Sequence, residues 1–130
     1  IMKKLTYLFL LVGIVMLVSS CQKPSEKAAG NYSGNYTTAF GTDPGTCNII
    51  TSGDNVNMTL TAPNQGISST ANGVTATTSG DNVSLSYSFT STTDGDITLI
   101  SGTLTGNSLS FSFTVRLGGF AVNGTFAGNK

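Results

Sequence analysis

Apolar and polar residues alternate strictly in three stretches of the chain, and each stretch follows a Gly-containing turn. The apolar positions are Val56, Met58 and Leu60, then Val83, Leu85, Tyr87 and Phe89, then Leu109, Phe111, Phe113 and Val115. A period of two with one apolar face is typical of a half-buried antiparallel strand. The pattern therefore predicts an all-β domain in which these residues face the core.

The turns before these stretches belong to a repeat. The sequence TSGDNV occurs at 51–56 and again 27 residues later at 78–83, and a looser copy occupies 104–109. Gly-Asp-Asn and Gly-Asn favour the positive φ angles of tight hairpin turns. Because 27 residues cover two strands and two turns, each unit is expected to be one hairpin with its return connection.

The remaining segments fit the same scheme. Tyr32, Tyr36 and Phe40 share one face of an opening strand, and 41–46 (GTDPGT) is predicted to be a Pro-containing turn. Further strands are predicted near 46–52, 55–61, 67–79, 82–90, 96–104, 108–116 and 119–128. We therefore expect eight strands.

One segment allows two interpretations. Asn72-Gly73 as the turn of a further hairpin would give nine strands. Aligning the repeats instead matches 67–79 with the single strand at 96–104, which favours a bulge at Asn72-Gly73. We retain eight.

Strands of this length allow three closures. A soluble up-and-down barrel and a two-layer sandwich both turn the apolar face inward, whereas a membrane-spanning barrel turns it outward. The many Thr and Ser residues on the strand faces, without aromatic girdles, argue against the last. Consecutive hairpins at even spacing favour the barrel over the sandwich, whose crossovers need longer connections. The prediction is an all-β fold: an eight-stranded antiparallel up-and-down barrel or meander.

The N-terminal segment has the features of an export signal. Lys3 and Lys4 precede an apolar stretch over 5–18, shorter than the about 20 residues of a membrane-spanning helix but suited to a signal peptide. Small residues and Cys21 close the stretch. This run resembles the lipobox of bacterial lipoprotein precursors, which implies cleavage before Cys21 and lipid on that residue. An ordinary secretory signal and an uncleaved short anchor are the alternatives.

The resemblance divides the chain into a signal peptide (1–20), a tether that starts at the lipidated cysteine (21–30) and a β-barrel domain (31–130). The tether is expected to be flexible because it is polar, contains Pro24 and lacks apolar periodicity. Gln22 stands where many lipoproteins of the inner membrane have Asp. The resemblance therefore implies the outer membrane, with the domain on its periplasmic or surface face.

The barrel region resembles a second group, small bacterial lipoproteins with a lipocalin-like (calycin-like) barrel. The resemblance covers 31–130 and depends on Gly-Asn-Tyr at 30–32 and 34–36, the hairpin turns and the last strand around 124–128. It implies a barrel that can hold a small ligand. Lipocalins have Gly-x-Trp in their first strand, and Tyr32 or Tyr36 would have to replace that Trp. Arg116 would cover the closed end as the family's late-strand Arg does, although it lies on the outward phase of its strand.

Composition excludes several functions. The chain has no His, and only six basic residues balance six acidic ones. Binding of nucleic acid through a basic surface, imidazole catalysis and His-based zinc sites are therefore excluded. Asp94-Gly95-Asp96 has too few carboxylates for calcium and is predicted to be a solvated turn. Cys47 is expected to be a small buried residue, and we predict no metal, cofactor or enzymatic activity.

Aromatic side chains on the inward phase either line a ligand cavity or fill the core. Small residues such as Gly34, Ala76 and Gly124 on the same face permit a cavity. The best candidates for its wall are Tyr36, Tyr87, Phe89 and Phe113. Two functions follow: a lipid-anchored barrel that binds a small hydrophobic or amphipathic ligand, or an interaction lipoprotein without a cavity. The second would dock an outer-membrane partner through its surface or an edge strand.

Overall fold

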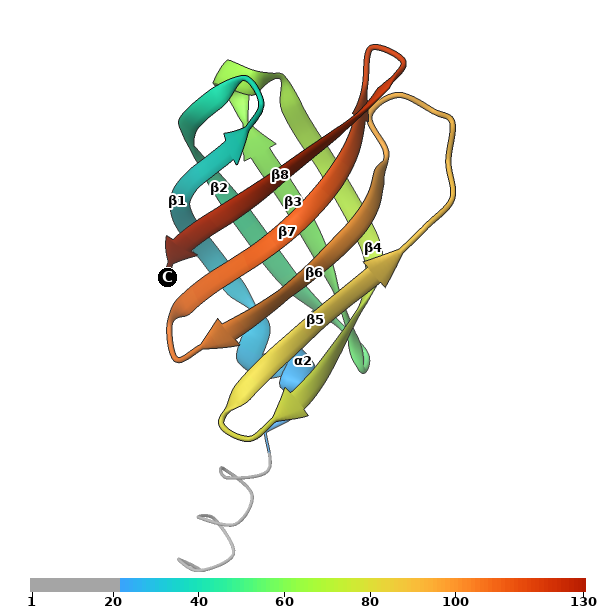
Figure 1. Cartoon of the computed structure of the whole chain (residues 1–130). Coiled ribbons are helices and arrows are strands. Elements are labelled where there is room, and N and C mark those ends of the chain that lie inside the picture. The colour runs from blue at the N-terminus through green and yellow to red at the C-terminus, as the bar shows by residue number, and fades with distance from the viewer. Residues whose placement is uncertain (1–21) are drawn as a thin grey trace, which may run out of the picture.

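The computed structural model of the protein describes residues 22–130, so the predicted signal peptide and Cys21 lie outside the described residues. Eight antiparallel strands follow one another around a closed barrel in sequence order, and β8 pairs with β1 (Figure 1). The strands are β1 (Gly30–Thr38), β2 (Gly41–Ser52), β3 (Asn55–Ala62), β4 (Ile67–Ser79), β5 (Asn82–Ser88), β6 (Ile97–Thr105), β7 (Ser108–Leu117) and β8 (Phe120–Asn129). The predicted eight-stranded up-and-down barrel is confirmed.

Three two-residue turns lie at one end of the barrel, which we call the base. They are Gly53-Asp54 between β2 and β3, Gly80-Asp81 between β4 and β5, and Gly106-Asn107 between β6 and β7. Their glycines have φ angles of 62°, 64° and 60°, which side chains rarely allow. The repeated Gly-Asp-Asn and Gly-Asn sequences therefore form hairpin turns, as predicted. We call the opposite end, where β1 meets β2 and β7 meets β8, the rim.

The prediction of a turn at 41–46 is wrong. The chain reverses at Ala39 and Phe40 and β2 begins at Gly41, so Phe40 lies at the rim, 73% exposed, instead of facing the core. Pro44 is tolerated within β2 because this part of the strand pairs only with β1; pairing with β3 starts at Thr46. A strand with one free side accommodates a residue that has no backbone N–H.

The predicted bulge in β4 is confirmed. The register with β3 shifts between the pairs Val56↔Val74 and Met58↔Ala71, which places Asn72-Gly73 opposite one residue, Asn57. Gly73 has a φ of 78°, and its N–H donates to Asn57 Oδ1 at 3.1 Å. A short 3-10 helix, η1 (Pro63–Gln65), leads into β4 at the rim.

β5 is shorter than the predicted strand 82–90 and ends at Ser88. The Phe89 N–H donates to the Thr98 carbonyl at 2.9 Å, and the chain then leaves the sheet in a loop over 89–96 that swings out from the barrel (Figure 1). The inward position predicted for Phe89 is therefore wrong, and half of its surface is exposed. The alternation of apolar and polar residues predicts which side chains point inward only as far as the strand extends.

The segment expected to be a flexible tether contains a helix. α2 (Pro24–Ala28) lies at the base of the barrel (Figure 1), and its Ser25 and Ala28 are fully buried. Pro24 suits the first turn of a helix, where an N–H has no internal partner. A helix of five residues that buries two small side chains is too short to produce an apolar period, which is why polar composition alone gave the wrong expectation.

Candidate functional site

Two of the four predicted ligand-contacting residues lie in the barrel interior. Tyr36 and Phe113 are 0% and 1% exposed, and they form an aromatic cluster with Phe111 and Phe126. The Tyr36 ring centroid is 4.7 Å from that of Phe126 and 5.6 Å from that of Phe113. The Phe111 and Phe126 centroids are 5.1 Å apart. These separations are typical of aromatic rings in contact, so the cluster occupies the interior as a packed core.

Small residues next to these rings do not leave a cavity. A Cβ atom added at Gly124 would lie 2.7 Å from Phe113 Cζ, and one at Gly45 would lie 2.6 Å from Tyr36 ring atoms. Each ring therefore covers the backbone of a glycine on another strand. Gly124 was expected to help open a cavity, and in the structure it makes room for the Phe113 ring instead.

The hydroxyls of the buried tyrosines are used within the fold. The Tyr36 hydroxyl donates to the Thr46 carbonyl at 2.6 Å, and the Tyr32 hydroxyl donates to the Ala28 carbonyl at 2.8 Å. Burial, and to a lesser degree the nearby Cys47 sulfur, raises the pKa of both phenols, that of Tyr32 to about 12. These two hydroxyls are therefore not free to orient a ligand.

Cys47 is a buried free thiol, as expected. It lies on β2 opposite Tyr32 of β1 and Leu60 of β3. Burial raises the pKa of the thiol to about 12. Because the thiolate is the reactive form, Cys47 is a core residue and not a nucleophile at neutral pH.

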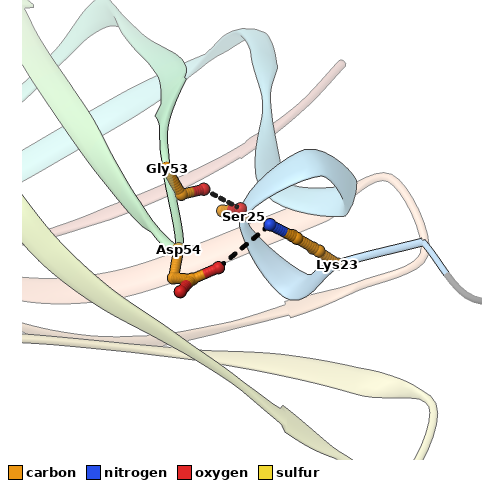
Figure 2. Close-up of polar contacts among 4 residues, drawn as sticks. All are labelled: Lys23, Ser25, Gly53 and Asp54. Atoms are coloured by element: carbon orange, nitrogen blue, oxygen red, sulfur yellow. Dashed lines mark hydrogen bonds and ion pairs between the residues drawn. The ribbon is translucent and has the colours of Figure 1, made fainter.

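Polar contacts fasten α2 to the β2–β3 turn and so close the base (Figure 2). Ser25 Oγ donates to the Gly53 carbonyl at 3.0 Å, and Thr51 Oγ1 donates to the Ser25 carbonyl at 3.1 Å. Lys23 Nζ lies 3.1 Å from Asp54 Oδ1 in an exposed ion pair. The buried hydrogen bonds of Ser25 position the helix, whereas an exposed ion pair contributes little.

The C-terminal end of α2 is bound by Lys130, the residue that follows β8. Lys130 Nζ donates to the carbonyls of Lys27 and Ala29 at 2.9 and 3.1 Å, and it lies 5.4 Å from the centre of the Tyr32 ring. Lys27 lies in the last helical turn and Ala29 directly follows it, and backbone acceptors there lack partners within the helix. α2 is thus a plug tied to β1, β2 and β8.

The other two predicted ligand residues, Tyr87 and Phe89, lie at a hollow in the outer wall. The hollow has a volume of about 380 Å³ and is lined by Thr70, Asn72, Tyr87, Phe89, Asp96 and Ile97. Tyr87 packs partly against the core, with its ring 6.4 Å from that of Phe89. Burial, followed by the nearby Asp96, raises the pKa of Tyr87. The structure therefore divides the four predicted residues between the interior and this side hollow.

Two more surface hollows lie at the ends of the barrel. At the rim, Phe40 and Phe120 are 73% and 74% exposed and line a hollow of about 360 Å³. Beside the plug, a hollow of about 540 Å³ has Glu26, Lys27, Asp81 and Lys130 among its lining residues. The rim hollow is apolar, and the base hollow carries both signs of charge.

The carboxylates at 94–96 organise a loop. Asp94 Oδ1 accepts from the Gly119 N–H at 2.8 Å, and Asp96 Oδ2 accepts from Ser91 Oγ at 2.6 Å. Within 22–130, no group of three or more His, Cys, Asp or Glu residues is placed to hold a metal ion. Arg116 lies next to the rim turn, where its Nη2 donates to the Gly119 carbonyl at 3.2 Å. It does not cover the plugged end, contrary to the role that the lipocalin resemblance implies.

Comparison of the chain with protein-family models, with curated proteins and with solved structures finds no match. The part of the chain that the structure describes contains no helix long and apolar enough to cross a membrane. The assignment of function therefore depends on the geometry of the barrel and on the sequence before it.

Proposed function

We propose that this domain is an interaction module of the cell envelope, held by lipid on Cys21 and recognising a protein partner with its outer surface. The observation that carries the proposal is the filled interior. Tyr36, Phe111, Phe113 and Phe126 pack against one another in the barrel, and α2 closes the base. The surfaces that remain for recognition face outward. The proposal includes no catalytic step and no cofactor.

The position of α2 supports a defined orientation. Only Gln22 and Lys23 separate Cys21 from the first helical residue, Pro24. The three residue steps from Cys21 to Pro24 span at most about 11 Å. A lipid on Cys21 would therefore hold the base next to the membrane, which the resemblance implies is the outer membrane, and the rim would point away from it.

Ligand carriage is the competing function. A small hydrophobic ligand in the interior would have to displace rings that are 0–2% exposed, and the two tyrosine hydroxyls there already have acceptors. The residue pair outside this core, Tyr87 and Phe89, borders a hollow that is open to solvent. Binding a ligand in the interior would therefore require the barrel to rearrange. Recognition of a partner by the outer surface requires no such rearrangement.

A binding experiment separates these functions. The chain from Gln22 onward contains the core and plug contacts described above, and it should be offered a hydrophobic dye and, separately, benzene. Phe113→Ala is the positive control, because an apolar cavity of about 150 Å³ binds benzene. We expect benzene to bind the variant and neither probe to bind the folded wild-type interior. Dye binding by the native fold that fatty acids reverse would contradict the proposal.

Membrane attachment is tested independently. Cys21→Ser in the full chain should release the domain from the membrane fraction or leave an uncleaved precursor. Ser20→Ala, which keeps Cys21 and a small residue before it, is the matched control and should stay attached. Processing and attachment of the Cys21→Ser chain like those of the wild type would remove the lipid anchor from the proposal.

A further inference from the structure

The wall of the barrel is incompletely paired between β4 and β5. β5 pairs with β4 only over 75–79, so the first eight residues of β4, 67–74, have no strand partner on that side. Their other side pairs with β3 through Ile67↔Ala62 to Val74↔Val56. The loop over 89–96 carries the chain outward at this height instead of continuing β5 along β4 (Figure 1). This stretch is the longest unpaired strand edge among the described residues.

The backbone groups on this side of β4 have no strand partner. An unpaired strand presents backbone N–H and C=O groups that another extended chain can pair with. Ser69 lies in the middle of the stretch, 7% exposed, and its buried Oγ has no hydrogen-bond partner among the described residues. Its side chain points toward the barrel interior, like those of Ile67 and Ala71, so the case for an added strand rests on the unpaired backbone groups of the edge.

Side chains of the hollow next to this edge define what can occupy it. Thr70 and Asn72 point outward from β4, and Tyr87 and Phe89 supply apolar ring surface across the hollow. Asp96 lies in the hollow and forms no ion pair within 22–130. The hollow is therefore suited to a large apolar side chain beside a basic one.

We propose that the 67–74 edge of β4 binds an extended segment of a partner protein as an added strand, with a large apolar side chain against Tyr87 and Phe89 and a Lys or Arg near Asp96. This inference rests on the proposed interaction function and names its site and its class of partner. Backbone pairing would supply affinity, and the hollow would supply selectivity.

A panel of synthetic seven-residue peptides of alternating Thr and Val, Ile or Phe, each with one Lys, tests the site by amide hydrogen exchange. At a peptide concentration of 100 times the Kd, we expect exchange of the β4 edge amides to slow roughly 100-fold, because binding reduces the open population by that factor. Methylation of the alternate backbone nitrogens that face β4 should abolish binding, whereas methylation of the other set, whose N–H groups point away from β4, should leave binding intact. Replacing Lys by Glu should weaken binding at least about tenfold.

Variants place the binding on this edge. Thr70→Lys with Asn72→Lys should abolish binding, since lysines on an edge block strand addition and repel the peptide. Thr103→Lys is the matched control, an exposed position on β6 that is paired on both sides, and should bind as the wild type does. Phe89→Ala should weaken binding about fivefold to tenfold.

Three results would overturn the inference. The first is failure of the whole panel to slow exchange at 67–74. The second is equal binding of the two methylated series. The third is concentration-dependent dimerisation that the two edge lysines abolish, which would make a second copy of this chain the occupant. None of these affects the dye and benzene experiment. The interaction function can therefore survive the loss of this site, and dye binding in the interior would remove that function whatever the peptides show.

Discussion

The two sides of the barrel wall differ in how far their strands are paired. β7 and β8 pair over ten residues, 108–117 with 120–129, whereas β4 and β5 pair over five, 75–79 with 82–86. On the closed side, rings such as Phe113 lie over glycines of neighbouring strands and complete the wall. On the open side, Tyr87 packs only partly against the core, and Phe89 lies outside it. The comparison teaches that the β7–β8 side is paired along its whole length over buried rings, whereas the β4–β5 side leaves a strand edge unpaired beside an exposed ring.

The largest expected effect is in the closed side. Phe111→Ala should lower the free energy of unfolding by about 3–5 kcal/mol, because a fully buried ring is lost and a cavity remains. Its neighbour Ser110 points outward from β7, and Ser110→Ala should change stability by less than about 0.5 kcal/mol. Chemical denaturation of both variants measures the difference. Equal losses would remove the basis for assigning inner and outer faces.

A second test uses the buried thiol of β2, which is paired on both sides at this position. Folding raises the pKa of Cys47 from 9.0 to about 12, so the folded state holds this proton more tightly than the unfolded state. Its contribution to stability is complete below about pH 9 and is lost as the pH rises toward 12, by up to about 1.4 kcal/mol per pH unit. Urea denaturation at pH 8, 9 and 10 should show this loss. In Cys47→Ala the slope between pH 9 and 10 should be shallower, and an unchanged slope would contradict the assignment.

The plug should contribute an intermediate amount. Ser25→Ala removes the part-buried hydrogen bond from the fully buried Ser25 to the Gly53 carbonyl and should cost about 0.5–1.5 kcal/mol. Lys23→Ala removes only an exposed ion pair and should cost less than about 1 kcal/mol. Denaturation of the chain from Gln22 onward compares them. If Ser25→Ala is as stable as the wild type, α2 does not act as a fixed plug.

The smallest effect is expected on the open side. Phe89→Ala and Thr70→Lys change exposed side chains at an incomplete wall, and each should shift the free energy of unfolding by less than about 0.5 kcal/mol. Amides of 67–73 should nevertheless exchange faster than those of 109–115 in the free domain, because only one side of β4 is paired there. Equal protection of the two segments would show that the open side is closed in solution.

The candidate site was only partly predictable. Alternation placed Tyr36 and Phe113 on the inner face, which is correct, but it cannot show whether inward rings surround a space or fill it. That depends on which residue each ring meets across the sheet, as Phe113 meets Gly124 and Tyr36 meets Gly45. Phe89 was placed inward because the alternation continues to that residue, although β5 ends one residue earlier.

By itself, the sequence determined the number of strands, the inner faces of their central residues, the Gly-Asp and Gly-Asn turns and the bulge at Asn72-Gly73, because these features depend on local backbone preferences and on a period of two. It misplaced the ends of strands, at the β1–β2 turn and after Ser88. Only the tertiary structure decided that the interior is filled, that Pro24–Ala28 closes the base and that the 67–74 edge is unpaired. The reason is physical. Local preference determines the conformation of a segment, but whether a ring has space beside it, or a strand has a neighbour, depends on residues far away in the chain.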